Sequence, residues 1–87
     1  MATAVNGVAV IDQDALAFKP SSATIKAGER VLFKNSETAL HTVTIDAKNV
    51  SGPMRRGESF EFVPSNPGVY RITCDYHPQM RATLTVE

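Results

Sequence analysis

The sequence is poor in residues that crosslink or anchor a small protein, since Cys74 is the only cysteine among 87 residues and tryptophan is absent. A disulfide within the chain is therefore excluded. A chain of this length buries only a small hydrophobic core, so it needs extensive strand pairing, a bound metal or both. The length leaves no room for a second core, and we expect a single domain over residues 1–87.

Charge of one sign is also missing, because nine Lys and Arg balance nine Asp and Glu. Such a chain has no net field that would hold nucleic acid or an anionic membrane. No apolar run approaches the ~18 residues of a membrane helix, and the first residues lack the basic and apolar regions of a signal peptide. We therefore expect a soluble chain without a nucleic-acid partner or stable membrane insertion.

Short segments rich in Val, Ile, Thr, Phe and Tyr alternate with clusters of Gly, Pro, Asn, Asp and Ser. This pattern is typical of strands and turns, and no segment has helical periodicity. Residues 12–14 are expected to form a turn, and residues 48–57 the longest surface loop. The predicted strands are 5–11, 15–19, 23–26, 30–35, 41–46, 59–63, 68–74 and 82–86.

Several of these strands carry apolar residues at every second position, which places them on one face of a sheet. Eight short strands, several of them with one apolar face, fit an all-β sandwich whose core lies between two sheets. The pairs that define the core faces are Val31 and Phe33, Val43 and Ile45, Phe60 and Phe62, and Leu84 and Val86.

The segment from Cys74 to Met80 gathers three soft or borderline metal donors within seven residues, with His77 between the two sulfur residues. Two residues separate each neighbouring pair, and Pro78 stiffens the loop without needing a backbone donor. The only other histidine, His41, begins a predicted strand 33 residues before Cys74. Neighbouring strands of a sandwich would bring it beside this loop.

Two imidazoles and one thiolate in a plane, with a weak thioether, form the donor set of a type 1 (blue) copper site. We therefore predict His41, Cys74, His77 and Met80 as ligands of one copper ion that cycles between Cu(I) and Cu(II). A structural zinc site would present four Cys or His donors, and this chain has three. Asp75 is not expected to bind, because a hard carboxylate is a poor donor for Cu(I).

Further segments add to this ligand pattern, namely Phe18-Lys19-Pro20, the segments 23–31 and 33–35, His41-Thr-Val-Thr, and Pro67-Gly68-Val-Tyr70 running into Cys74 and His77. With these segments, most of the chain resembles the plastocyanin-like cupredoxins, a family of blue copper proteins. The short Cys-x-x-His-Pro-x-Met loop, the following Arg81 and the upstream Gly52-Pro53-Met54 are most similar to the amicyanins within that family.

The resemblance implies an eight-stranded Greek-key sandwich with copper at one end, Cys74 buried and His77 near the surface. It also implies a monomeric one-electron carrier rather than an enzyme, in the periplasm or another extracytoplasmic compartment. Transient redox proteins such as a c-type cytochrome or a periplasmic dehydrogenase would be its partners. Thr42 departs from the family, which has an asparagine there that ties the two ligand segments together, so the rigidity and reduction potential stay open.

Two other functions use the same ligands. A module for copper storage, delivery or resistance would need no redox partner, whereas a domain of a larger copper oxidase would need histidines beyond the two present. Met54 is expected to pack in the core or at the rim of the site, and Arg55-Arg56 to be solvated. Tyr76 is either a lid over the site or a surface aromatic.

Overall fold

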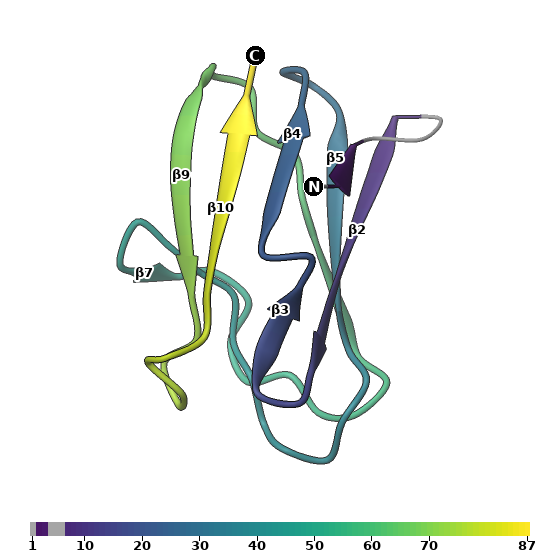
Figure 1. Cartoon of the computed structure of the whole chain (residues 1–87), viewed down its shortest axis with the longest axis vertical. Helices are drawn as coiled ribbons and strands as arrows, with labels where there is room; N and C mark the ends of the chain where they lie inside the picture. The colour runs from purple at the N-terminus through teal and green to yellow at the C-terminus, as the bar shows by residue number, and fades with distance from the viewer. Residues whose placement is uncertain (1, 4–6) are drawn as a thin grey trace.

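The structure is a computed structural model that describes residues 2–3 and 7–87 (Figure 1). These residues form ten strands and no helix, so none of them belongs to a helix that could cross a membrane. The strands are β1 (Ala2–Thr3), β2 (Val8–Asp14), β3 (Ala17–Lys19), β4 (Ser22–Ile25), β5 (Arg30–Asn35), β6 (Thr44–Ile45), β7 (Lys48–Asn49), β8 (Ser59–Phe62), β9 (Gly68–Thr73) and β10 (Arg81–Val86).

The strands form two mixed sheets packed as a sandwich, as the sequence predicted. One sheet has six strands in the order β1-β4-β10-β9-β6-β7, and the other has four in the order β3-β2-β5-β8. The longest antiparallel ladder joins β9 to β10 from Val86↔Gly68 to Arg81↔Thr73. In the second sheet, β2 runs parallel to β5 and antiparallel to β3. The segment between β9 and β10 therefore connects two strands that are paired along their whole length.

All eight predicted strands overlap a strand of the structure, and the prediction for β5 has the observed bounds. The structure adds the two-residue strands β1 and β7, and β7 lies inside the predicted long loop. The sheet pairs only Thr44–Ile45 of the predicted strand 41–46. His41 instead forms an isolated bridge with Met54. Residues 5 and 6 of the first predicted strand lie outside the described residues.

The predicted turn at residues 12–14 is wrong, because β2 continues to Asp14 and pairs there with Ala17. The chain reverses at Ala15 and Leu16, whose φ angles are 52° and 54°. Positive φ is unfavourable for side chains other than glycine, so neither residue signals a turn. Gln13 is buried within β2, so residues 12–14 belong to the strand although all three are polar.

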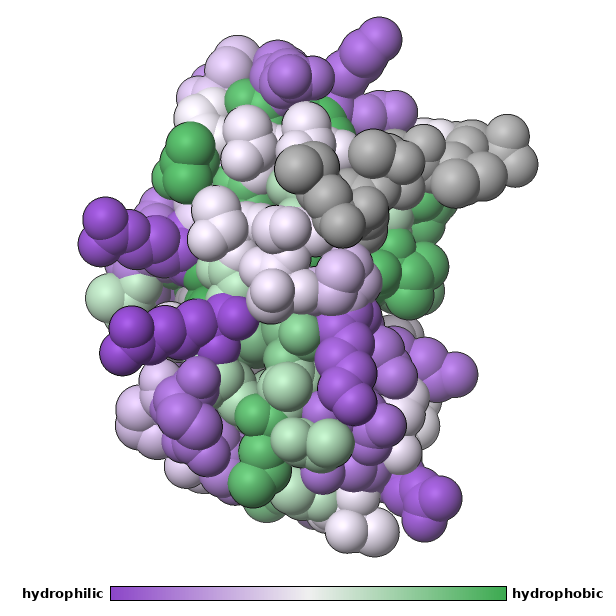
Figure 2. Space-filling model, in the orientation of Figure 1, coloured by the Kyte–Doolittle hydropathy of each residue, from purple (hydrophilic) through white to green (hydrophobic). Residues whose placement is uncertain are grey.

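The core lies between the sheets and contains the alternating residues that the sequence pattern indicated. Phe60, Phe62 and Tyr70 pack partly buried against it. On the face shown in Figure 2, apolar side chains form only small areas between hydrophilic ones. The buried hydrophobic residues are Ala9, Ile11, Phe18, Ala23, Ile25, Val31, Phe33, Val43, Ile45, Met54, Ile72, Cys74, Met80, Ala82, Leu84 and Val86.

Candidate metal centre

A buried wall at one end of the sandwich carries His41. The wall consists of Gln13, Asn35, His41, Thr42 and Met54, each at most 3% exposed. His41 is fixed in it by two backbone hydrogen bonds, since its N–H donates to the Met54 carbonyl (3.2 Å) and its carbonyl accepts from the Met54 N–H (2.7 Å). The backbone of this ligand candidate is therefore paired on both sides even though it lies outside the regular ladder.

Asn35, the last residue of β5, holds the segment that leads to His41. Its Nδ2 donates to the carbonyl oxygens of Ala39 (2.8 Å) and Met54 (2.9 Å), and its Oδ1 accepts from the Glu37 N–H (2.9 Å). A buried amide that satisfies three backbone groups replaces water that cannot reach them. Asn35 thus shapes the connection between β5 and the ligand candidate.

The imidazole of His41 is oriented by Glu37. The Nε2 atom of His41 lies 2.6 Å from Glu37 Oε2, which leaves Nδ1 to face the interior of the site. Metal-binding histidines commonly bond a carboxylate through the nitrogen that does not bind the metal, because this fixes the tautomer and the ring. The arrangement therefore leaves Nδ1 as the His41 nitrogen that is free to face a metal ion.

The carboxyl group of Glu37 is adapted to this contact. Its partial burial disfavours the charged form, but the hydrogen bond from the Leu16 N–H and the interactions with His41 and His77 outweigh that effect. The pKa of Glu37 is therefore lower than its ordinary value. Glu37 therefore favours the carboxylate form, which accepts a hydrogen bond from His41 Nε2–H.

The other donors lie on the ligand loop, residues 74–80, which connects β9 to β10. Cys74 is 2% exposed and Met80 is 1% exposed, whereas His77 between them is half-buried. The Met80 N–H donates to the His77 carbonyl (2.9 Å), which closes a turn within the loop. Both ends of the loop are thus inside the protein, and its middle reaches the surface.

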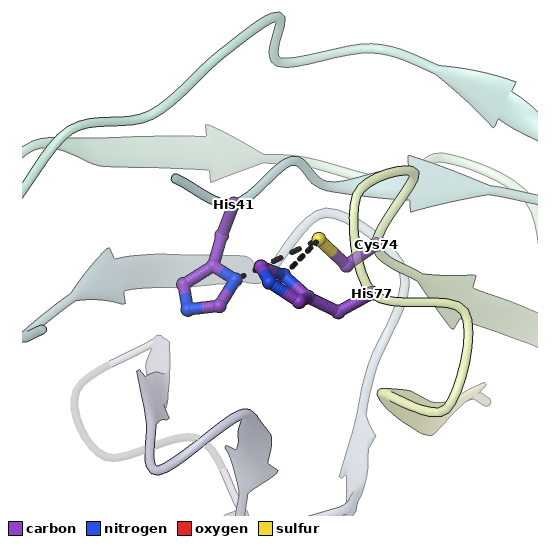
Figure 3. A group of neighbouring side chains, drawn as sticks. All are labelled: His41, Cys74 and His77. Atoms are coloured by element: carbon purple, nitrogen blue, oxygen red, sulfur yellow. Dashed lines mark hydrogen bonds between the residues drawn. The ribbon is translucent and has the colours of Figure 1, made fainter. Parts of the chain in front are cut away.

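Three of the four predicted ligands converge (Figure 3). The donor atoms of His41, Cys74 and His77 all lie within 4.8 Å of one another. Cys74 Sγ is 3.6 Å from His41 Nδ1 and 3.7 Å from His77 Nδ1. The two imidazole centroids are 5.0 Å apart with their planes at 62°. The grouping of these three side chains therefore agrees with the interpretation of the sequence spacing.

This spacing fits a trigonal first-row metal ion. Bonds of about 2.0 Å to nitrogen and about 2.3 Å to sulfur in a trigonal plane place sulfur and nitrogen about 3.7 Å apart. The observed sulfur–nitrogen distances are 3.6 and 3.7 Å. A thiolate with two imidazoles suits copper in both oxidation states, so the residues fit that metal.

Residues around the donors follow the predictions in part. Met54 is buried in the core and so adds nothing to an exposed rim. Tyr76 is 49% exposed, which makes it a surface aromatic rather than a buried lid. Asp75 is absent from the donor group and bonds Thr44 and Asn49 instead. Arg55-Arg56 is exposed, in agreement with a solvated pair.

Glu37, Gln13 and Asn35 contribute to the site without having been predicted. Glu37 precedes His41 by four residues, which is a contact spacing in helices, and this segment is not helical. Gln13 lay in the segment predicted as a turn. The segment between β5 and His41 brings Glu37 to the site, and the pairing of β2 with β5 places Gln13 beside Asn35. No local pattern in the sequence encodes these contacts.

Comparisons with known proteins agree with this geometry. A protein-family model described as a Cupredoxin-like domain matches residues 2–86. Plastocyanin A/B of Petroselinum crispum is 32% identical over 86% of this chain and 92% of its own length. Amicyanin-alpha of Methylorubrum extorquens is 36% identical over 80% of this chain, which spans 64% of that longer relative.

A solved structure has the same architecture. The crystal structure of amicyanin from Paracoccus versutus is 26% identical, with a TM-score of 0.83 over 90% of this chain and 79% of the other. Amicyanin structures at 22% identity reach TM-scores of 0.85 and 0.86, which supports the fold alone.

Proposed function

This chain belongs to the cupredoxin-like family and its cofactor is copper, and we propose that it is a type 1 (blue) copper protein that carries single electrons between redox partners. The observation that carries the proposal is a thiol and two imidazoles grouped at one end of the sandwich, with only one of them reaching the surface.

We propose His41, Cys74, His77 and Met80 as the copper ligands. Cys74 would supply a strong thiolate donor, His41 and His77 would each supply an imidazole nitrogen, and Met80 would supply a weak thioether donor. Support for Met80 is its burial beside the turn that it closes with His77. When bound, copper supplies a one-electron couple between Cu(I) and Cu(II).

The protein contributes a cage that changes little between the two oxidation states. Glu37 holds the His41 ring, Met54 holds the His41 backbone, and the burial of Cys74 excludes water from the sulfur. Groups that are already placed need no rearrangement when the charge of the site changes, so little reorganisation opposes electron transfer. This rigidity favours a carrier over a storage module, which needs an open and exchangeable site.

His77 is the route for electrons. Its imidazole is half-buried, while His41, Cys74 and Met80 are at most 2% exposed. Tyr76 and Pro78 flank it in the chain and are exposed, so a partner can approach the ring edge over a small apolar area. Contacts of this kind bury less than about 1,200 Å² and bind weakly and fast.

The family supports a proposal for the physiological setting. We propose that the protein acts as a monomer outside the cytoplasm, for example in the periplasm, and its similarity to plastocyanins and amicyanins supports this setting. The partners would be soluble redox proteins such as a c-type cytochrome or a periplasmic dehydrogenase.

The first test is the visible absorption and EPR spectrum after one equivalent of Cu(II). We expect an intense charge-transfer band and a narrow copper hyperfine splitting, because the thiolate binds the metal directly. Cys74→Ser should abolish both, and the single cysteine makes this control free of other thiols. A pale, ordinary Cu(II) spectrum of the unchanged protein would sink the proposal.

Voltammetry then separates a carrier from a storage protein. A carrier should give a reversible one-electron wave with copper retained in both states. Release of copper on oxidation or reduction would instead assign the same residues to storage or delivery.

A further inference from the structure

Thr42 is held by hydrogen bonds from three directions. Its N–H donates to Cys74 Sγ (3.4 Å), its Oγ1 accepts from the Asp75 N–H (2.9 Å), and its carbonyl accepts from Gln13 Nε2 (3.2 Å). The residue itself is 1% exposed. It therefore joins the segment after His41 to the segment after Cys74, in the place where the family resemblance implies an asparagine.

Threonine does not make this junction alone. Thr44, two residues further on, points to the same side of the extended chain, and its Oγ1 lies 2.9 Å from Thr42 Oγ1. Thr44 also bonds Asp75 Oδ1 at 2.7 Å. A carboxylate oxygen only accepts hydrogen bonds, so the Thr44 hydroxyl donates its hydrogen to Asp75. The Thr44 oxygen then accepts the hydrogen bond that the Thr42 hydroxyl donates.

These hydrogen bonds thus form a closed ring in which each group donates to the next. The Asp75 N–H donates to Thr42, Thr42 donates to Thr44, and Thr44 donates to the Asp75 carboxylate. The second carboxylate oxygen accepts from Asn49 Nδ2 at 3.0 Å, which extends the ring to β7. Hydrogen bonds in such a chain polarise one another, so the ring is stiffer than three separate bonds.

We propose that this ring is the positioning unit that holds the Thr42 N–H against the Cys74 sulfur and so sets the reduction potential of the site. The inference rests on the proposed function for its effect on copper, but the ring itself is a property of the folded chain. A hydrogen bond to a thiolate withdraws charge from the sulfur, which favours Cu(I) over Cu(II). Thr44 and Asp75 act through Thr42, because neither supplies an atom to the donor group.

The ring is tested first in the metal-free protein. Thr44→Val and Asp75→Ala each open it and leave the Asp75 N–H bond to Thr42 in place. We expect the Thr42 and Asp75 amides to exchange hydrogen about 10-fold faster, as follows from the loss of a supporting hydrogen bond. Thr83→Val, on the exposed face of β10, is the matched control and should leave both rates unchanged.

The effect on copper is tested in the loaded protein. Thr42→Val, Thr44→Val and Asp75→Ala should lower the reduction potential and shift the thiolate charge-transfer band, and Thr42→Ser should restore both because it keeps the hydroxyl. Thr83→Val should change neither. A general loss of packing would not be reversed by a single hydroxyl.

Unchanged amide exchange in both Thr44→Val and Asp75→Ala would overturn the ring. An equal potential shift in Thr83→Val, or failure of Thr42→Ser to restore the potential, would overturn its role. If Thr42→Val does not fold, the exposed Asp75→Ala variant carries the same test. If the unchanged protein shows no blue band, the proposed function fails, and the exchange rates still decide whether the ring exists.

Discussion

The buried wall and the ligand loop meet at the same site but are built in opposite ways. The wall is enclosed, and side chains from β2 and β5 hold its backbone. The loop is buried only at its two ends, Cys74 and Met80, and its middle is exposed except for the half-buried His77. One region thus supplies fixed geometry and the other supplies access.

The difference indicates how a small protein can combine a rigid site with contact to partners. An exposed loop is ordinarily the most mobile part of a fold. Here the loop is fastened to the wall through Thr42, which bonds both Cys74 and Asp75. The loop is therefore held in place by the wall, so in the metal-free protein a substitution in the wall should destabilise the fold more than a substitution in the loop.

Removal of copper should give the largest effect and should act on the loop. At free copper about 1,000 times the dissociation constant, the metal adds about 4 kcal/mol to the free energy of unfolding. Denaturation with and without copper measures this difference. Hydrogen exchange should show that removal exposes the amides of Tyr76, His77 and Gln79, while the amides of His41 and Asp75, which bond Met54 and Thr42, stay protected. Equal loss of protection at His41 and in the ligand loop would contradict the difference between the buried wall and the ligand loop.

Asn35→Ala should be the next largest change, since it opens the wall without touching a donor. It removes three hydrogen bonds and takes the side-chain partner from the Ala39 carbonyl and the Glu37 N–H, while the Met54 carbonyl still accepts from the His41 N–H. Leaving such groups unpaired costs about 1–3 kcal/mol each, and we expect the free energy of unfolding of the metal-free protein to fall by about 3 kcal/mol. Urea denaturation provides the measurement. The exposed Asn66→Ala is the control, expected within about 0.5 kcal/mol, and similar values for both would contradict the role of the wall.

Glu37→Gln should have the smallest effect, because it changes only the group that orients the His41 imidazole. The amide can still accept the bond from His41 Nε2 but no longer carries a charge beside it. Because partners of this kind orient a ligand, copper affinity should fall by about 10-fold, with little change in metal-free stability. Competition with a chelator reports the affinity. An unchanged affinity would mean that Met54 alone fixes His41.

The fold was predictable wherever alternation was regular. In β5, Val31 and Phe33 face inward and the observed bounds match the prediction. Prediction failed at the tight reversal Ala15-Leu16, where φ is positive at two residues other than glycine. Pairing across the sheets overrides the local preference there, and a single sequence does not reveal that pairing.

The candidate site was predictable to the extent that its donors are chemically distinctive. Cysteine, histidine and methionine at short spacing indicate a soft metal site by their donor chemistry alone. The groups that hold them are ordinary polar residues. Glu37 and Gln13 acquire their roles from contacts across the chain, of which the Gln13 contact with Thr42 spans 29 residues. Their function depends on the completed fold.

The direction of β10 has a practical consequence for electrochemistry. The strand begins at Arg81, beside the ligand loop, and ends at Val86, where Glu87 is bonded to Ile25 and Ala27 (Figure 1). Six residues of strand span about 20 Å. A linker attached beside Val86 would therefore fix the molecule to an electrode with His77 turned toward the solution. Such a layer would present every molecule in the same orientation to a dissolved redox partner, while electron tunnelling to the electrode itself would have to cross the length of the sandwich.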